Sequence, residues 1–579
     1  MRKLLLLLLL CVGFLNQLLA QQKIITGKVT DSKGAGIAGA SVIIKGTQEG
    51  TTTNDDGSFS LALSGAAKTL LISYTGHDEE EVNIGNKSQI NITLTTTEKN
   101  LQEVVVVGYG TQKKKTVTSA ITKIQGESIA TTPATSVDRM LAGRASGVQV
   151  TQGTGLVNAA PRVRIRGVNS LTGGRDPLFV VDGIPTPSGG LSAVANTNPL
   201  SDINPADIES IEVLKDGAAT AIFGSRASNG VVMITTKKGR AGKMSVNYDM
   251  YVGMSQAFRK PELLNAEEFV TISNEKFANA GQGPVAFMNS ENTNTDWLKE
   301  IFKENGTAQS HTISLAGGND RTTYYFSLNY LQQQGMIVTN YVKRYNMRAN
   351  FEHKINRFVK MGNNITLGRT EDNDQNNGGN ALSGAMAASM RALPNVRVYN
   401  PDHPTGYNIT PSGEALGADA NTRTIENNFI NPKYVLDHNK ANSDKYRIIS
   451  NAFLELSPLS GLTVRSQVSV DYQTGTDFNY LNPFHGDGRG PEGLVVNQNL
   501  QRSRYVWQNF FNYNKTFASR HTIGLTGGIE MQRDINRSFS ATGAELSDIF
   551  FASDNLISNT SAVELSGGNL SKAGFQSYF

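Results

Sequence analysis

INPADIESIEVLKDGAATAIFGSRASNGVVMITTKKG, residues 203–239, is the stretch that decides the fold. Its first part, from Asp207 onward, has the pattern of a strand entered from a short turn. Residues 230–239 form a second apolar strand, and a short glycine-containing segment connects the two. Two apolar strands separated by a compact connection predict a mixed αβ domain rather than an all-helical one.

The sequence before this stretch extends the same domain. In PRVRIRGVNSL (161–171), Val163 and Ile165 alternate with three arginines, which predicts a strand with one apolar and one charged face. DPLFVVDGIP (176–185) predicts a buried strand that stops at an Asp-Gly turn. We therefore expect one domain over residues 116–243.

These phrases, together with MLAGRASGVQV (140–150), occur in the order found in the plug domain of TonB-dependent receptors, which this segment resembles. GSRASNGVVMITTKKG (224–239) is especially similar to the SusC/RagA family. The resemblance implies a set of plug-motif residues: Arg166, Gly167, Asp182, Gly183, Lys215, Asp216, Gly224, Ser225, Arg226 and Gly230.

Catalysis is the least favoured function for these residues. The glycines lack the Gly-x-Gly-x-x-Gly and Walker spacings of phosphate-binding loops. Lys215, Asp216 and Arg226 are interpreted as buried ion pairs that hold the domain together, since no nucleophile and base are paired. The seven histidines are scattered and Cys11 is the only cysteine. We expect no enzyme, no cofactor and no metal site.

Beyond residue 243 the pattern changes to long alternating strands. Residues 343–353 place Tyr345, Met347, Ala349 and Phe351 on one face, with Arg344, Asn346, Arg348 and Asn350 on the other. We expect strands near 243–253, 308–317, 321–332, 343–353, 357–369, 445–457, 461–473, 502–515 and 521–532. The connections alternate between longer and short, as in outer-membrane barrels. The overall prediction is a mainly β protein whose residues 244–579 form the first part of a transmembrane β-barrel.

The barrel is expected to be truncated. KAGFQSYF (572–579) resembles the start of a tenth strand, whereas plugged transporters of this class use 22 strands. An unclosed barrel would leave unpaired edge groups in lipid, which is costly. We therefore interpret the sequence as an N-terminal fragment.

Residues 21–97 predict a small β-sandwich, since strand-like runs recur about every ten residues between glycine-rich turns. GKVTD (27–31), GAGIAGASVIIKGT (34–47) and TTTNDDGSFSL (51–61) resemble the carboxypeptidase regulatory-like domain. Asn54 to Gly57 lack the alternating carboxylates of a calcium loop and predict a hairpin turn instead.

A distinct segment, 98–115, joins the two domains. It contains Glu103, Val104, Val105, Val106 and Val107, followed by a lysine-rich linker. An exposed strand of this kind can add to the sheet of another protein. EVVVVGYGTQKK (103–114) resembles the TonB-box region of SusC/RagA proteins, which implies pairing with TonB. A purely structural strand is the alternative.

The start of the chain predicts export. Arg2 and Lys3 precede an apolar run, and Ala20 marks a cleavage site, so residues 1–20 have the pattern of a secretory signal peptide. No later stretch approaches the about 18 apolar residues of a membrane helix. The formal net charge of +4 favours no polyanionic partner, so nucleic acid is not expected.

The resemblance implies a function in the outer membrane of a Gram-negative bacterium. It implies TonB-dependent import of oligosaccharides or peptides, with plug movement driven by TonB with ExbB and ExbD, a SusD-like surface lipoprotein as partner and outer-membrane lipid around the barrel. Segments 254–307, 370–444 and 474–501 would form the outer loops. A surface receptor or adhesin, or a signal-transducing receptor without transport, is the alternative. The ligand-binding residues are not predicted.

Overall fold

A computed structural model describes residues 24–579, except for 32–33, 48, 64–68, 75–76, 78, 86, 95–103, 108–109, 114–119, 127, 129–135, 171–173, 188, 193–197, 374–383, 424, 426–429, 518–520 and 548–556. The predicted signal peptide (1–20) and Glu103 lie outside the described residues. The chain divides into two compact units, with the division near residues 104–117. Each unit is described by itself.

The first unit is a small sandwich of two sheets, ordered β4-β1-β7 and β3-β2-β5-β6 in the described residues. Along β1, Ile25 and Val29 are fully buried while Thr26 and Lys28 are exposed, so the apolar side chains face the interior. Leu70 and Ile72 on β5 belong to the same core. The strands are β1 (Ile24–Thr30), β2 (Ser41–Ile44), β3 (Gly50–Thr52), β4 (Ser58–Ala62), β5 (Thr69–Ser73), β6 (Glu80–Asn83) and β7 (Gln89–Thr93).

The segment that was expected to couple to TonB contains two short strands. β8 (Val104–Val107) and β9 (Gly110–Lys113) form a two-stranded sheet. Four consecutive β-branched residues favour this extended conformation. One edge of β8 is therefore paired within the chain.

The second unit begins with a mixed domain, here called the inner domain, over residues 120–241. Its five-stranded sheet has the order β10-β15-β16-β13-β14 in the described residues, and β15 and β16 are buried along nearly their whole length. Near-continuous apolar runs such as Val231–Thr236 suit strands that are covered on both faces. The elements are β10 (Ile121–Gln125), η3 (Arg139–Leu141), β11 (Val148–Thr151), β12 (Arg162–Ile165), β13 (Leu178–Val181), β14 (Ile184–Thr186), η4 (Pro205–Asp207), β15 (Ile208–Leu214), α3 (Gly217–Thr220), η5 (Ala221–Ala227) and β16 (Val231–Thr236).

The turn between β13 and β14 has an unusual backbone. Asp182 has φ 48° and Gly183 has φ 86°, so both central residues of this two-residue hairpin are left-handed. A turn with two positive φ angles matches the twist of the flanking strands, and Asp-Gly is a preferred sequence for it. The hairpin predicted from the sequence is thus formed, and the turn projects the Asp182 side chain away from the sheet.

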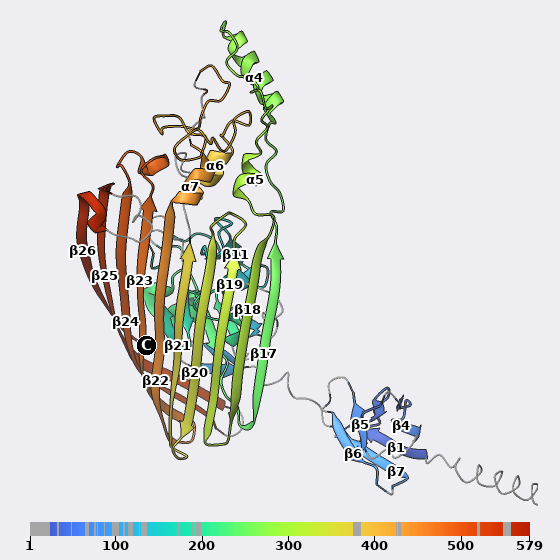
Figure 1. Cartoon of the computed structure of the whole chain (residues 1–579). Coiled ribbons are helices and arrows are strands. Elements are labelled where there is room, and N and C mark those ends of the chain that lie inside the picture. Colours follow the sequence, from blue (N-terminus) through green and yellow to red (C-terminus); the bar gives the residue numbers. More distant parts are fainter. Residues whose placement is uncertain are drawn as a thin grey trace, which may run out of the picture. The chain divides into compact units, whose positions relative to one another are not determined.

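Ten long strands form the large sheet of the second unit, each paired antiparallel with the next along the chain (Figure 1). They are β17 (Gly242–Ser255), β18 (Gly306–Gly318), β19 (Thr322–Gln334), β20 (Tyr341–Lys354), β21 (Val359–Asn373), β22 (Lys440–Leu459), β23 (Leu462–Leu481), β24 (Leu494–Phe517), β25 (His521–Leu546) and β26 (Thr560–Tyr578). The order agrees with the sequence prediction, but β22 to β25 are 20 to 26 residues long and extend well past the expected ends. The expected tenth strand is present as β26, but its predicted start at 572 is wrong, because β26 begins at Thr560 and ends at Tyr578.

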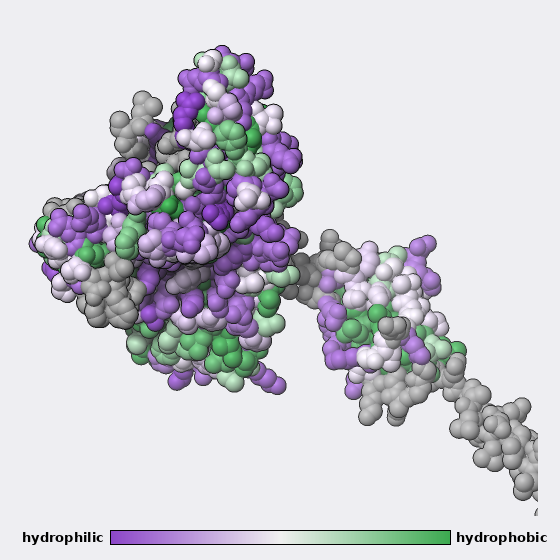
Figure 2. Space-filling model, turned by 45° about the horizontal axis from the view of Figure 1, so that its top comes forward, coloured by the Kyte–Doolittle hydropathy of each residue, from purple (hydrophilic) through white to green (hydrophobic). Residues whose placement is uncertain are grey.

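The two faces of the large sheet have opposite polarity. On β20 the inward residues Arg344, Asn346, Arg348 and Asn350 are at most 6% exposed, whereas Tyr345 and Phe351 on the outward face are more than 40% exposed. In Figure 2 the hydrophobic surface of this unit gathers below a hydrophilic end that carries the loops. A polar interior and an apolar exterior are the pattern of a membrane barrel sheet. Among the described residues, no helix is both long and apolar enough to cross a membrane.

The longer connections gather at one end of the large sheet and form a structure that we call the cap. It comprises the described residues of 256–305, 374–439 and 482–493, with α4 (Ala266–Asn279), α5 (Trp297–Ile301), α6 (Ala385–Ser389), α7 (Pro432–His438) and η6 (Gly486–Gly488). Trp297 is 2% exposed and packs with Leu393 and Val396. A final connection contains η8 (Ile557–Asn559). The loop expected at 474–501 is shorter because β23 and β24 extend into it.

Candidate functional site: the interface between the inner domain and the large sheet

Residues of the inner domain contact every strand of the large sheet from β18 to β26. The contacts, in strand order, are Asn204 with Thr312, Asp207 with Tyr325, Asp182 with Arg348, Asp202 with Thr370, Asp182 with Asn451, Ser192 with Asp477, Gly183 with Gln508, Arg226 with Glu530 and Arg226 with Phe575. Most of these contacts are hydrogen bonds between polar groups that the large sheet directs inward. The interface is therefore mainly a polar seam. Apolar contacts add to it where Phe510 of β24 joins the buried cluster around Phe223 and where Val157 packs with Leu331.

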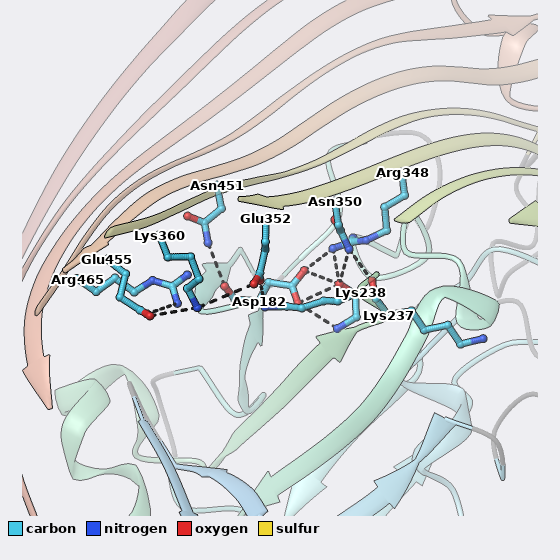
Figure 3. A network of polar contacts seen from close by, with 11 residues as sticks. Asp182, Lys237, Lys238, Arg348, Asn350, Glu352, Lys360, Asn451, Glu455 and Arg465 are labelled. Carbon is cyan, nitrogen blue, oxygen red and sulfur yellow. Dashed lines mark hydrogen bonds and ion pairs between the residues drawn. The ribbon is translucent and has the colours of Figure 1, made fainter. Parts of the chain in front are cut away.

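Asp182 is the centre of this seam (Figure 3). One carboxylate oxygen accepts hydrogen bonds from the backbone N and the hydroxyl of Thr236, both at 3.0 Å, and the other oxygen accepts from Arg348. The side chains of Arg348 and Asp182 are only 4% and 7% exposed. Asn451 donates to the Asp182 carbonyl at 3.2 Å. A buried ion pair of this kind is costly to break, because separation leaves one charge without a partner.

The residues after Asp182 contact the next strands of the large sheet. The Gly183 carbonyl accepts from Gln508 at 3.4 Å, and the Pro185 carbonyl accepts from Arg504 at 3.0 Å. Arg504 is in turn held by Asp534 through two contacts of 2.8 Å. One hairpin of the inner domain thus contacts β20, β22 and β24.

Arg226 forms a second anchor on β25 and β26. It follows Gly224, whose φ of 66° interrupts the helical turns of η5. Its guanidinium donates to Glu530 and Gln532, both at 2.6 Å, and lies 4.0 Å from the centre of the Phe575 ring. The planar guanidinium can satisfy several such partners at once.

A row of alternating charges continues from this site along the large sheet (Figure 3). Lys238, which follows β16 at the end of the inner domain, lies 2.7 Å from Glu352 on β20, and Glu352 lies 3.9 Å from Lys360 on β21. Lys360 lies 3.1 Å from Glu455 on β22, which lies 3.7 Å from Arg465 on β23. Lys360 and Glu455 are direct register partners, as are Glu455 and Arg465. Each charge therefore has neighbours of opposite sign on adjacent strands.

This row borders a cavity of about 1110 Å³ between the inner domain and the large sheet. Asp182, Lys238, Lys360, Glu455 and Arg465 are among its lining residues. Its lining also includes apolar residues such as Ile222 and Leu462. A space of this size next to the inner domain leaves room for that domain to change position.

Two predicted site residues, Lys215 and Asp216, have other roles than the expected buried ion pairs. Asp216 pairs with Arg166, and the side chain of Arg166 is 51% exposed. Lys215 donates to the Ser146 hydroxyl at 3.3 Å and is half-buried. The Asp216 carboxylate also accepts from the backbone N of Ala120 at 2.7 Å, and this hydrogen bond lowers the pKa of Asp216. The expectation of buried ion pairs is therefore wrong for these two residues, because they lie at the rim of the domain.

Arg226 also differs from that expectation. Its buried partner, Glu530, belongs to the large sheet, so the pair fastens the inner domain to its surroundings instead of holding the domain together. Glycines at 167, 224 and 230 all have positive φ angles, and a Cβ at Gly230 would lie 2.8 Å from Ile165. Ser225 accepts from the backbone N of Ser228 at 3.3 Å. These four residues shape the backbone around Arg166 and Arg226.

Asp207 is a further buried carboxyl that sequence reasoning did not select. It accepts from the Tyr325 hydroxyl at 2.8 Å and the Ser327 hydroxyl at 2.9 Å. Burial raises the pKa of Asp207, while Arg348 and the two hydroxyls favour its charged form. The sequence contains one weak indication of this contact. Tyr325 and Ser327 alternate with the apolar outward residues of β19, so they lie on the inward face, where they can contact the inner domain.

The chemistry of this interface is noncovalent. In the described part of the chain, no group of three His, Cys, Asp or Glu residues is arranged to hold a metal ion. Hydrogen bonds and ion pairs fix the inner domain, and they can be exchanged for water without breaking covalent bonds. Such an arrangement suits a domain that is retained until a force or a ligand displaces it.

A separate domain held on the concave, polar side of a membrane-type antiparallel sheet defines a plugged outer-membrane receptor. The comparisons agree: residues 113–231 match the TonB-dependent Receptor Plug Domain, and residues 25–106 match the CarboxypepD_reg-like domain. The chain belongs to the TonB-dependent receptors of the SusC/RagA type. This family consists of receptors rather than enzymes.

Particular relatives support this assignment. TonB-dependent receptor P26 of Formosa agariphila is 31% identical over 523 residues, covering 88% of this chain and 49% of that protein. TonB-dependent receptor SusC of Bacteroides thetaiotaomicron is 31% identical over 531 residues, covering 88% and 50%. The RagAB peptide importer in its open-open state matches with a TM-score of 0.68 and 25% identity, covering 82% of this chain and 54% of that one. The chain thus spans about half the length of the relatives it matches.

Proposed function

We propose that the protein takes part in the TonB-dependent import of large nutrients, oligosaccharides or peptides, across the outer membrane of a Gram-negative bacterium. The single observation that carries the proposal is the inner domain held by a polar seam on the concave face of the large sheet. A domain retained by hydrogen bonds and ion pairs can be displaced without losing a hydrophobic core of its own, which is what a reversible plug requires.

The coupling segment supports an energised mechanism. β8 (Val104–Val107) precedes the inner domain, and Ala120, near the entrance of that domain, is fastened by Asp216. TonB, with ExbB and ExbD, would pair with this strand by β-augmentation. Because β9 covers one edge of β8, TonB adds to the other edge or replaces β9. Tension would then reach the inner domain first at Ala120 and Asp216.

The cap is the proposed nutrient side of the molecule. It closes the end of the large sheet that carries the longer connections, which in outer-membrane barrels is the extracellular end. Exposed aromatic residues such as Tyr399 and Phe484 lie there. A SusD-like surface lipoprotein would contact the same end. The name of the RagAB peptide importer supports peptides as a class of nutrient. Oligosaccharides are the second class implied by the SusC/RagA resemblance of the sequence.

The alternative is a surface receptor or adhesin, or a signalling receptor, that binds without transport. It shares the cap and the inner domain but needs no coupling strand. The Val104–Val107 strand distinguishes the two hypotheses, because only energised import requires it to pair with TonB.

The test is growth on, and uptake of, candidate glycans and peptides by cells that produce the full-length protein with Val105→Pro. Proline removes a backbone donor and opposes strand pairing, whereas the matched control Val105→Thr retains both the donor and the β propensity. We expect uptake to collapse in the proline variant alone, at equal levels in the outer membrane. Unchanged uptake in both variants would reject coupling through this strand and favour binding without transport.

A further inference from the structure

The outward face of β17 to β22 contains two hollows that no part of the proposed import mechanism uses. One, of about 520 Å³, is lined by outward residues that include Leu328, Tyr330, Tyr345, Arg369 and Tyr446. The other, of about 570 Å³, is lined by residues closer to the cap. Both lie on the side of the sheet that faces away from the inner domain.

Strand periodicity places these two hollows next to each other on one face of the sheet, and together they are here called the groove. On β19, Tyr330 of the first hollow is followed on the same face by Gln332 of the second. On β20, Tyr345 is likewise two positions from Lys343. Because side chains of a strand alternate between faces, residues two apart are direct neighbours on one surface. The groove therefore runs along the strands towards the cap.

The part far from the cap is apolar. Ile313, Leu328 and Met347 line it, with four tyrosines towards its upper end. Tyr345 and Tyr446 are 44% and 46% exposed. Tyrosines at the border of an apolar band mark the level where the hydrocarbon of a bilayer meets its headgroups. This part fits an acyl chain.

The part near the cap is cationic. Lys303, Lys343 and Lys440 line it together with amide side chains such as Gln332 and Asn442. The neighbouring carboxylates have cationic partners of their own: Glu371 and Asp444 lie within 3.0 Å of Arg369, and Asp437 lies within hydrogen-bonding distance of Lys433. The three lysines thus give this part an excess of positive charge at headgroup level, which complements a phosphate.

We propose that this groove is a binding site for an anionic lipid of the outer leaflet, with the phosphate among Lys303, Lys343 and Lys440 and an acyl chain against the tyrosines. A soluble anion would not need the apolar half, and a neutral lipid would not need the lysines. The inference rests on the membrane location in the proposed function but is independent of transport.

Native mass spectrometry of the full chain in detergent micelles tests the site. The probes are lipid A, dioleoyl phosphatidylglycerol, dioleoyl phosphatidylcholine and inorganic phosphate. We expect selective retention of the two anionic lipids and about thirtyfold weaker retention by Lys303→Gln/Lys343→Gln, which removes two basic residues. The matched control, Lys354→Gln/Lys515→Gln, removes two lysines at the opposite end of the large sheet and should bind normally.

Three results would overturn the proposal: equal retention of anionic and zwitterionic lipid, unchanged binding by the groove variant, or binding of inorganic phosphate as tight as that of the lipids. If the double variant does not fold, as judged by heat-modifiable migration on a gel, the single variants Lys343→Gln and Lys515→Gln carry the same comparison. Nutrient uptake is not part of the readout, so failure of the import proposal leaves this test intact.

Discussion

The small sandwich and the large sheet use the same alternation of side chains and bury opposite faces. On β1 of the sandwich, Ile25 and Val29 are buried while Lys28 is exposed. On β20 of the large sheet, Arg348 is buried while Phe351 is exposed. The comparison teaches that a period of two identifies a sheet with two different faces, whereas the surroundings determine which face is inside.

Removing Arg348 should have the largest effect, because the buried Asp182 carboxylate of the inner domain loses its charged partner on the large sheet. Arg348→Ala leaves Asp182 with only its hydrogen bonds from Thr236. We expect about 3–5 kcal/mol of destabilisation at the interface with the inner domain. Limited proteolysis of the inner domain in isolated membranes measures it.

The neutral pair Asp182→Asn/Arg348→Gln is the control, since asparagine also tolerates the positive φ at this position. It should recover most of the protection. If Arg348→Ala is as protected as the unchanged protein, the polar seam does not retain the inner domain.

An apolar residue in the sandwich should come next. Ile72 is fully buried, so Ile72→Ala leaves a cavity that costs about 2–5 kcal/mol. Hydrogen exchange of the intact protein measures this loss as reduced protection of the backbone amides in β1 to β7. Retained protection would mean that this core collapses around the smaller side chain.

The cap contains a buried histidine and should respond to pH. His485 accepts from the backbone N of Asn431 at 2.8 Å and donates to the Gly413 carbonyl at 2.7 Å, and burial lowers its pKa to about 4. The folded cap therefore holds a neutral ring. Its contribution to stability is present above the ordinary pKa of about 6.5 and is lost as the pH falls towards 4.

Between pH 7.5 and 5 this loss amounts to about 2 kcal/mol. The protection factor of α7, whose first turn is capped by Asn431, should fall by about thirtyfold over that range once hydrogen exchange is corrected for the intrinsic pH dependence of the exchange rate. His485→Asn should flatten the pH dependence of exchange. An equal pH response in both proteins would assign it to another group.

The smallest effect is expected on the outward face of the large sheet. Leu328 is 44% exposed there. Leu328→Ala should cost less than about 1 kcal/mol in a bilayer, because lipid hydrocarbon replaces the lost contact. Urea unfolding in vesicles, next to the Ile72→Ala result, measures the contrast. A loss as large as that of Ile72→Ala would mean that protein rather than lipid covers this face.

Much of the architecture followed from local patterns. The Asp182–Gly183 turn, the strand order and the inward position of Arg348 were all readable from the alternation and from turn chemistry. Strand ends were not, because polar residues near the cap continue the pairing without an apolar signal. The limits of the domains and the role of Val104–Val107 stay predictions.

The partners of the site residues could not be read in the same way. Asp182 and Arg348 are separated by 166 residues, and Arg226 and Glu530 by 304. Lys215 and Asp216 belong to the same charged and glycine-containing stretch as Arg226, but they lie at the rim of the inner domain. The partner of a charged residue cannot be predicted from the sequence, because the fold brings together segments that are distant in the chain.

The sequence by itself determined that the chain contains a small sandwich, a mixed domain and a series of long two-faced strands, because hydrophobic periodicity and turn residues act over a few neighbouring positions. Only the tertiary structure decided which charged residues are buried and with whom they pair. The reason is physical: buried arginine and asparagine need partners. Arg348 and Asn350 find theirs in the inner domain, more than a hundred residues away, whereas Arg504 finds its partner on a neighbouring strand.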